Sequence, residues 1–239
     1  ALQAGGVVIR SCFSVVSPGT EGTKLKEAKL SLPEKARARP DLVKLVMDVV
    51  RQQGLRAAYS KVINRLEQLT PLGYSLAGEI VAVADDVDEF SVGDRVAAGG
   101  AGYANHAEYN FVPRNLVVAL PQQVQLEHAA FTTIGSIAMH AYRQSESSLG
   151  EVALVIGLGL VGQLLTQILV AGGVSVVGID LDSDRCRLAE AAGAVCAAVP
   201  GSAQWRPALG PLGADVVFIV AGSDDNTLLE LAANNVRDR

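Results

Sequence analysis

The feature that most constrains the fold is a glycine-rich turn at residues 157–162, with the sequence GLGLVG. An apolar run at 152–156 precedes it directly and predicts a buried strand. The apolar stretch 161–170 that follows predicts a helix, and 174–179 predicts a second buried strand that ends before Asp180. A strand, a glycine-rich turn, a helix and a second strand in this order predict a βαβ unit of a parallel sheet.

The same alternation continues toward the end of the chain. A helix is expected over 184–192, and strands are expected over 195–199 and 215–220. The fold class predicted for this region is therefore α/β, with a doubly wound parallel sheet of the Rossmann type.

This combination of residues is the dinucleotide-binding fingerprint. Gly157 permits the tight turn, Gly159 leaves room for a pyrophosphate beside the backbone, and Gly162 lets the helix pack closely. Asp180 is expected to accept hydrogen bonds from the adenosine ribose and to repel a 2′-phosphate, which favours NAD over NADP. Arg185 either stacks on the adenine or softens that preference. The expected cofactor-binding residues are Gly157, Gly159, Leu160, Val161, Gly162, Asp180, Arg185, Ala221 and Gly222.

The first part of the chain predicts a second domain that is rich in β structure. A strand is expected over 7–16, and short strands follow one another between 73 and 118, as in a small barrel. Ser17-Pro18-Gly19-Thr20 predicts a turn, because proline fixes φ and glycine accepts positive φ. Extended structure is expected from Ala104 to Val112, and helix from Pro121 to His140. The expected domains are residues 1–145 and 146–239.

The segment 41–69 carries apolar residues at helical spacing and is interrupted by Gly54, so it predicts two successive helices. They serve as a lid, a dimer contact or a docking face, or their apolar stripe packs on the β-rich domain.

Composition and charge exclude several classes of protein. The 239 residues are 49% hydrophobic, which is enough for a packed core. The net charge of −5, without a basic cluster, argues against a nucleic-acid surface, and no run of eighteen apolar residues predicts a membrane span. Three scattered cysteines without a CxxC pair disfavour disulfides and a cysteine-rich zinc site. We therefore expect a cytoplasmic protein with a small-molecule substrate.

Several stretches carry a resemblance to a known family. They are SPGTE at 17–21, VGDRV at 92–96, EHAAF at 127–131 and the segment 180–194, in addition to the glycine-rich turn. With them the chain resembles the medium-chain dehydrogenase/reductase family. The segment 41–69 and the sequence TPLGYSLAG are similar to a subgroup that is fused to an oxidoreductase of the Gfo/Idh/MocA type.

The resemblance implies a GroES-like barrel domain followed by a Rossmann domain, NAD-dependent hydride transfer and a homo-oligomer, either a dimer or a tetramer. A member of the family carries further structure before Ala1 and after Arg239, so the fold is expected to be incomplete at both ends.

The sequence departs from the family at every position that binds zinc in its zinc-containing members. Their GHE motif is replaced by Gly73-Tyr74-Ser75, the first-loop cysteine by residues 16–18, and the third ligand falls at Thr133. The cysteine-rich lobe matches 99–106, which contains no cysteine. Because a catalytic zinc needs about three protein ligands, no metal site is expected.

Candidate catalytic residues are Tyr74 and Thr133. Tyr74 either donates a proton to the substrate or is a half-buried tyrosine whose hydroxyl is bonded locally, and the second interpretation is favoured. Thr133 and Ser136 either bond the nicotinamide or the substrate, or cap a helix. His106 is a general acid or, the favoured interpretation, a surface-loop residue. We interpret three further residues as structural, and Cys12 among them as a small core residue: Cys12, His128 and His140.

The sequence thus favours a zinc-independent NAD(H)-dependent oxidoreductase that acts on a small carbonyl, alcohol or sugar-type substrate. Two alternatives remain. One is a non-catalytic nucleotide-binding module of a larger fused oxidoreductase, and the other is a lyase or epimerase with tightly bound NAD.

Overall fold

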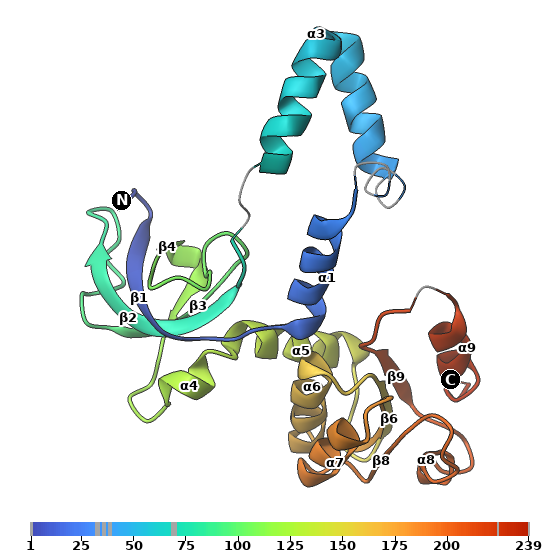
Figure 1. Cartoon of the computed structure of the whole chain (residues 1–239). Helices are drawn as coiled ribbons and strands as arrows, with labels where there is room; N and C mark the ends of the chain where they lie inside the picture. The colour runs from blue at the N-terminus through green and yellow to red at the C-terminus, as the bar shows by residue number, and fades with distance from the viewer. Residues whose placement is uncertain are drawn as a thin grey trace.

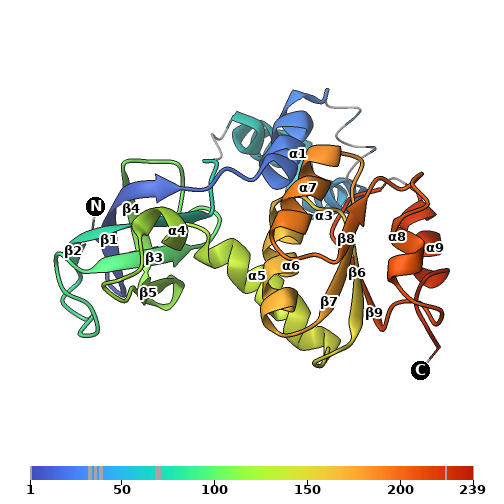
Figure 2. The same cartoon turned by 90° about the horizontal axis from the view of Figure 1, so that it is seen from below.

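The computed structural model describes residues 2–31, 34, 37, 40–67, 71–223 and 225–238. It contains an antiparallel lobe and a parallel lobe, each built around one sheet, and helix α5 (Thr132–Ser145) runs from one to the other (Figures 1 and 2). Among the described helices, none combines the length and the apolar composition that spanning a bilayer requires.

The antiparallel lobe contains five strands in the order β4-β1-β2-β3-β5. Their bounds are β1 (Gly6–Ser14), β2 (Ser75–Val83), β3 (Arg95–Gly99), β4 (Tyr109–Pro113) and β5 (Val117–Ala119), and a short 3-10 helix η1 (Arg114–Leu116) lies between the last two. Val7 on the interior strand β1 pairs with Val83 on one side and with Val112 on the other. The alternating side chains Val7 and Ile9 are fully buried, so one face of the sheet forms the core of this lobe.

Three expectations for this lobe are wrong. The strand expected to reach residue 16 ends at Ser14, and the expected turn at Ser17-Pro18-Gly19-Thr20 is the start of helix α1 (Pro18–Lys29). Proline is tolerated at the first position of a helix, where its missing N–H would have no helical partner. Extended structure begins at Tyr109 rather than Ala104, because the backbone of Asn105 and Ala107 is bonded to the side-chain amide of Asn110.

Cys12 also departs from its expected place. It lies at a shift in the β1–β2 register between Ser11 and Phe13, and its side chain is exposed rather than in the core. A bulge residue leaves the alternation of the strand, which explains why the pattern of apolar residues placed it on the wrong face.

Helix α3 (Pro40–Glu67) bends at Gly54, which has φ 82° and ψ 165°, as the sequence predicts. The helix stands clear of both sheets (Figure 1). Its side chains Leu45, Met47 and Leu55 are exposed, whereas Val46, Val49 and Val50 are half-buried. They do not pack on the antiparallel lobe. The last two residues of the expected segment, 68 and 69, lie outside the described residues.

The parallel lobe confirms the predicted α/β fold. Its strands are β6 (Val152–Ile156), β7 (Ser175–Ile179), β8 (Cys196–Ala198) and β9 (Val216–Ile219), and they follow the order β8-β7-β6-β9. The helices are α6 (Leu160–Ala171), α7 (Ser183–Ala191), α8 (Trp205–Ala208) and α9 (Thr227–Ala233). Val155 belongs to the core beneath α6, whereas its neighbours Leu154 and Ile156 belong to the core that contains Trp205 of α8. Both faces of the sheet are thus covered.

Helix α5 and the short helix α4 (Leu126–Ala129) connect the two lobes. Ile134 of α5 is buried with Ala77 and Ala97 of the antiparallel sheet, and Ala138, one turn later, is buried with Ala153 of the parallel sheet. Leu160 and Val161 of α6 pack against the cluster that contains Ile134. The start of α6 therefore lies against the antiparallel lobe. The domain division at residue 145 stays a prediction, although α5 ends there.

Candidate cofactor site

The turn between β6 and α6 requires glycine at its first position. Gly157 has φ 99°, and a Cβ there would lie 2.8 Å from the Cβ of Ala221 and 2.9 Å from its backbone nitrogen. Ala221 and Gly222 follow β9, the strand next to β6, so the two turns meet at the carboxyl edge of the sheet. This edge is where ligands bind in open α/β sheets.

Glycine is also required at the third position of the motif, for a different reason. A Cβ on Gly162 would lie 2.0 Å from the carbonyl oxygen of Gly157, which is a backbone atom and cannot rotate away. The first turn of α6 is therefore held against the turn that precedes it.

Gly159 differs from both, because a Cβ at this position would meet no atom within 4 Å. Its φ of −68° is open to any residue, so neither the backbone nor the packing demands glycine here. Gly159 caps α6, no side chain in the described part of the chain caps the same helix, and its first turn carries no acidic residue. The free space and the positive end of the helix fit a pyrophosphate.

Asp180 follows β7 and is tied to the glycine-rich turn. Its side chain is 9% exposed, Oδ2 accepts a hydrogen bond from the N–H of Leu158 at 2.7 Å, and Oδ1 accepts one from the N–H of Asp182 at 2.9 Å. A carboxylate offers about four lone-pair sites, so two remain for ribose hydroxyls. Asp182 itself caps α7 by accepting from the N–H of Asp184, and its side chain is 49% exposed.

Arg185 lies beside this carboxylate, with a guanidinium nitrogen 3.6 Å from Oδ1 of Asp180. Its side chain is half exposed, and a second nitrogen lies 3.6 Å from Asp182. Sequence reasoning missed Gln163, whose side-chain amide donates to the carbonyl of Leu158 at 3.1 Å and to that of Arg185 at 2.8 Å. Its one signal is its place directly after the last glycine of the motif. Gln163 joins the glycine-rich turn to α7.

The two candidate catalytic residues lie where the antiparallel lobe meets the start of α6. Tyr74 is half-buried and packs against the apolar cluster that Leu160 and Val161 also join. Thr133 lies in the first turn of α5, and its Oγ1 is 3.4 Å from the carbonyl oxygen of Ala98. Tyr74 thus packs in the same cluster as the first residues of α6, the helix that follows the glycine-rich turn. The side chain of Thr133 lies against β3.

Other candidates lie farther from this arrangement. Ser136 donates to the carbonyl of Thr133, one turn back in α5, and does not cap the helix. His128 and His140 are exposed on α4 and α5. His106, which the sequence favours as a surface-loop residue, has a side chain only 25% exposed and a partner at each ring nitrogen, Ser14 and Glu21.

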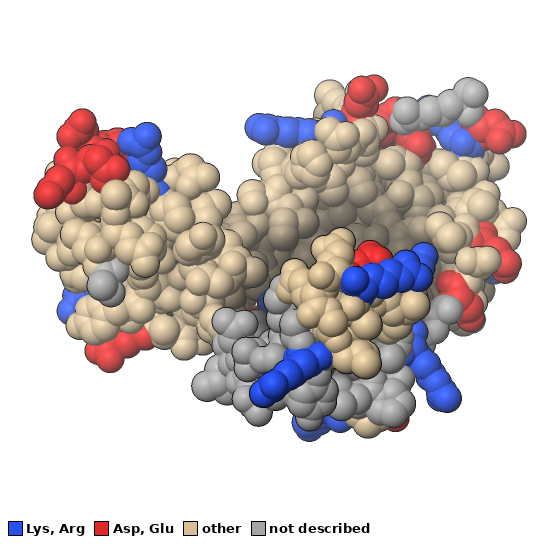
Figure 3. All heavy atoms as spheres, turned by 90° about the horizontal axis from the view of Figure 1, so that it is seen from above, with Lys and Arg blue, Asp and Glu red and all other residues tan. Residues whose placement is uncertain are grey.

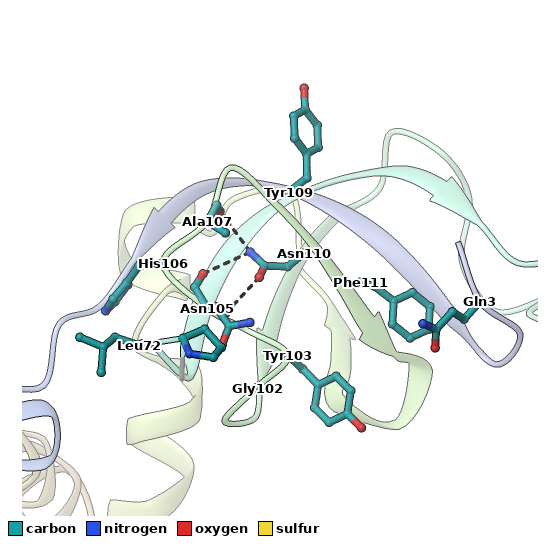
Figure 4. A pocket seen from close by; sticks show the side chains of 11 residues that line it. Gln3, Leu72, Gly102, Tyr103, Asn105, His106, Ala107, Tyr109, Asn110 and Phe111 are labelled. Atoms are coloured by element: carbon teal, nitrogen blue, oxygen red, sulfur yellow. Dashed lines mark hydrogen bonds between the residues drawn. The ribbon is translucent and has the colours of Figure 1, made fainter. Parts of the chain in front are cut away.

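A pocket of about 690 Å³ opens on the antiparallel lobe, and Figure 4 shows its lining. It lies between the loop 102–107, strand β4 and Leu72, with His106 at one end and Phe111 at the other. None of its lining residues belongs to the glycine-rich turn. The pocket is therefore separate from the space beside Gly159.

Comparison with known proteins agrees with the two lobes. Residues 47–122 match the family described as alcohol dehydrogenase GroES-like domain, and residues 153–238 match the TrkA-N domain. With these two domains the chain is similar to dehydrogenases and oxidoreductases of the medium-chain dehydrogenase/reductase family. The resemblance to a subgroup that is fused to an oxidoreductase of the Gfo/Idh/MocA type stays a prediction.

Three similar proteins illustrate the range of this family. D-guloside 3-dehydrogenase of Shigella flexneri is 30% identical over 162 residues, which are 64% of this chain and 45% of the relative. The crystal structure of 2R,3R-butanediol dehydrogenase from Bacillus subtilis has a TM-score of 0.61 at 26% identity, over 70% of this chain and 55% of the other. A quinone oxidoreductase of Pseudomonas syringae pv. Tomato DC3000 has a TM-score of 0.68 at 23% identity, over 100% of this chain and 64% of the other, and shows the fold alone. The chain spans less than half the length of the curated relatives it matches.

Within the described part of this protein, the side chains that could bind a metal lie apart from one another. Across the ranges that the structure describes, no three histidine, cysteine or acidic side chains come together as a metal ion would require. On the face seen in Figure 3, the surface between the two lobes is largely uncharged, and lysine and arginine side chains stand singly around it.

Proposed function

We propose that the protein is a zinc-independent NAD(H)-dependent oxidoreductase that interconverts a secondary alcohol and a ketone on a small polyol or sugar-type substrate. The observation that carries the cofactor assignment is the free space at Gly159, which no packing or backbone requirement explains. The names of the similar proteins, a guloside 3-dehydrogenase and a butanediol dehydrogenase, support a substrate with neighbouring hydroxyl groups.

The proposed roles follow from the positions of the residues. The backbone N–H groups at the start of α6 bind the pyrophosphate, and the carboxylate of Asp180 orients the adenosine ribose. The bound nicotinamide supplies or accepts the hydride. The residues where α6 meets the antiparallel lobe, Tyr74 among them, exclude water from the reacting carbon and hold it in place.

A substrate screen with the whole chain tests this proposal. Polyols, sugars and sugar phosphates are offered with NAD, and ketones, quinones and enones with NADH, while the absorbance of NADH is recorded. We expect turnover of a polyol or its ketone, and loss of that turnover in Gly159→Val. Turnover of quinones or enones alone would refute the substrate class.

The same screen separates the alternatives. A protein that binds NADH but turns over no substrate is a nucleotide-binding module. NAD that co-purifies, survives dialysis and is needed for an elimination or epimerisation would instead identify a lyase or epimerase.

A further inference from the structure

Three polar side chains from separate parts of the antiparallel lobe form a continuous hydrogen-bonded chain. Ser14 ends β1, Glu21 lies in the first turn of α1, and His106 lies in the loop before β4. The Oγ of Ser14 is 2.9 Å from Nδ1 of His106, and Nε2 of His106 is 3.0 Å from Oε2 of Glu21. None of the three groups belongs to the cofactor site described above, and Glu21 also bonds the N–H of Ser17 at the start of α1.

The carboxylate of Glu21 is buried and held from both sides. Its Oε1 accepts a hydrogen bond from the N–H of Ser17 at 2.9 Å, and its Oε2 faces His106. A buried carboxylate is costly unless its oxygens are bonded, and an ionised carboxylate can only accept. The arrangement therefore assigns the proton of the imidazole to Nε2.

With the proton on Nε2, the other ring nitrogen is an acceptor. Nδ1 of His106 then accepts a hydrogen bond from the hydroxyl group of Ser14. Ser14 is exposed, so its oxygen is open to a further partner from outside the protein. A serine whose proton is held by a histidine, which is oriented by a carboxylate, is an arrangement built to move a proton.

The loop fixes the imidazole in this position. The N–H of His106 donates to the carbonyl of Leu72 at 2.8 Å, and a Cβ on Gly73 would lie 2.6 Å from that nitrogen and 3.0 Å from Nδ1. Asn110 bonds the carbonyls of Asn105 and Ala107 on either side of the histidine (Figure 4). The ring therefore has little freedom to leave its two partners.

Residues adjacent in sequence to this hydrogen-bonded chain pack against the start of helix α6. Val15 follows Ser14 directly, and Tyr74 follows Gly73, against which the imidazole rests. Both Val15 and Tyr74 belong to the apolar cluster that Leu160 and Val161 of α6 join. The backbone that carries Ser14, and the glycine against which His106 rests, thus adjoin residues that pack against helix α6.

We propose that Ser14, His106 and Glu21 form the proton relay for the substrate oxygen in the hydride transfer, a role that rests on the proposed function. Ser14 is the catalytic residue, and His106 and Glu21 are positioning residues that act through it. The relay replaces the metal ion that a zinc-containing member uses on the substrate oxygen.

The step balances in the direction of alcohol oxidation. The substrate O–H bond breaks and its proton passes to Oγ of Ser14, while the proton of Ser14 passes to Nδ1 of His106. The electron pair of the O–H bond forms the second bond of C=O. The C–H bond breaks, and its hydrogen leaves with the electron pair as hydride to the oxidised nicotinamide. The resulting imidazolium is paired with the carboxylate of Glu21 until it releases its proton to water. Reduction of the ketone follows the same path backwards.

Steady-state kinetics of four variants of the relay residues and one control variant test the relay, with a substrate found in the screen above. We expect Ser14→Ala and His106→Ala to lower kcat by at least about 100-fold, the lower end of acid–base effects, while the Kd of NADH changes less than about twofold. Added imidazole should restore part of the kcat of His106→Ala and none of that of Ser14→Ala. Glu21→Gln should lower kcat, and Glu21→Asp should retain more of it. His140→Ala, which removes an exposed histidine, is the matched control and should leave kcat unchanged.

The outcomes are distinct. A kcat of Ser14→Ala within about threefold of the parent, in a protein with unchanged NADH affinity, would overturn the relay and leave the oxidoreductase standing. Because Ser14 is exposed at a strand end, this variant is expected to fold even if Glu21→Gln does not. A parent protein that binds NADH and turns over nothing would overturn the proposed function, and with it the role of the relay.

Discussion

The carboxylate of Asp180 accepts a hydrogen bond from the backbone N–H of Leu158 at 2.7 Å, so the end of β7 is joined directly to the glycine-rich turn after β6. An acidic residue at this position is expected to meet the adenosine ribose. The structure adds that the same side chain holds the turn in which the pyrophosphate is proposed to bind. Its replacement therefore changes two contacts at once.

Cofactor preference tests both contacts. The parent protein should bind NADH more than about tenfold tighter than NADPH, or ~1.4 kcal/mol, because the 2′-phosphate would face the carboxylate of Asp180. Asp180→Ser should narrow that gap, with Arg185 then able to meet the phosphate. Asp180→Asn keeps an oxygen for the N–H of Leu158 and separates the loss of charge from the loss of the loop contact. Fluorescence titration with both cofactors measures each affinity.

The control for this series is Asp182→Ser, which removes an exposed carboxylate two positions away. It should leave the preference unchanged. Equal affinity of the parent for both cofactors, or a preference that moves with Asp182 instead, would show that Asp180 is not the ribose ligand.

The second and third glycines of the motif, Gly159 and Gly162, should respond in opposite ways. Gly159→Val should lower NADH affinity more than tenfold, or ~1.4 kcal/mol, and Gly159→Ala should change the free energy of unfolding by under about 1 kcal/mol, since no atom lies within 4 Å of the new Cβ. Gly162→Ala should destabilise the fold by about 1–3 kcal/mol, because its Cβ would lie 2.0 Å from a backbone oxygen. Urea unfolding and NADH titration measure the two effects. Unchanged NADH affinity in a folded Gly159→Val protein would contradict the phosphate-loop assignment.

Metal content is the third prediction. By the family resemblance, Tyr74 stands in place of the histidine ligand of zinc-containing members, and in the structure it packs against an apolar cluster. Elemental analysis of the purified protein should find no stoichiometric zinc, and a chelator should not lower its activity. One tightly bound zinc per chain would overturn this expectation and would point to ligands outside the described residues.

The fourth prediction concerns the C-terminal end of the parallel lobe. Asp215 is buried, one of its oxygens accepts from the N–H of Val152 at 2.7 Å, and the other is paired with Arg237. Arg237→Ala should therefore lower the free energy of unfolding by about 1–3 kcal/mol, because it leaves a buried carboxylate without its cation, and the partly exposed arginine limits the loss. The control Arg187→Ala breaks the exposed pair with Asp184 and should cost less than about 1 kcal/mol. Equal effects of the two variants in urea unfolding would contradict the role of Asp215.

The local backbone of the parallel lobe could be predicted from the sequence. Apolar runs bounded by glycine predict β6, α6 and β7 to within one or two residues, because burial on both faces and the helical period leave a pattern in consecutive residues. The bend at Gly54 is predictable for the same reason, since a single glycine with positive φ ends the helical pattern. These features depend on residues that are close together in the sequence, so they can be predicted from the order of residues alone.

In the antiparallel lobe, prediction from neighbouring residues fails at two places. Ser17-Pro18-Gly19-Thr20 has the composition of a turn, yet it begins α1, where the buried carboxylate of Glu21 bonds the N–H of Ser17. The exposed place of Cys12 depends on a register shift against β2, which the alternation within β1 does not reveal.

The strongest case is the contact of His106 with Ser14 and Glu21, which precede it by 92 and 85 positions. A lone histidine in a glycine-rich loop has no neighbour in sequence that predicts its partners. Sequence determined the cofactor turn because its glycines act on adjacent backbone atoms. Only the tertiary structure decided which side chains share a proton, because strand pairing and the packing of α1 bring those distant segments together.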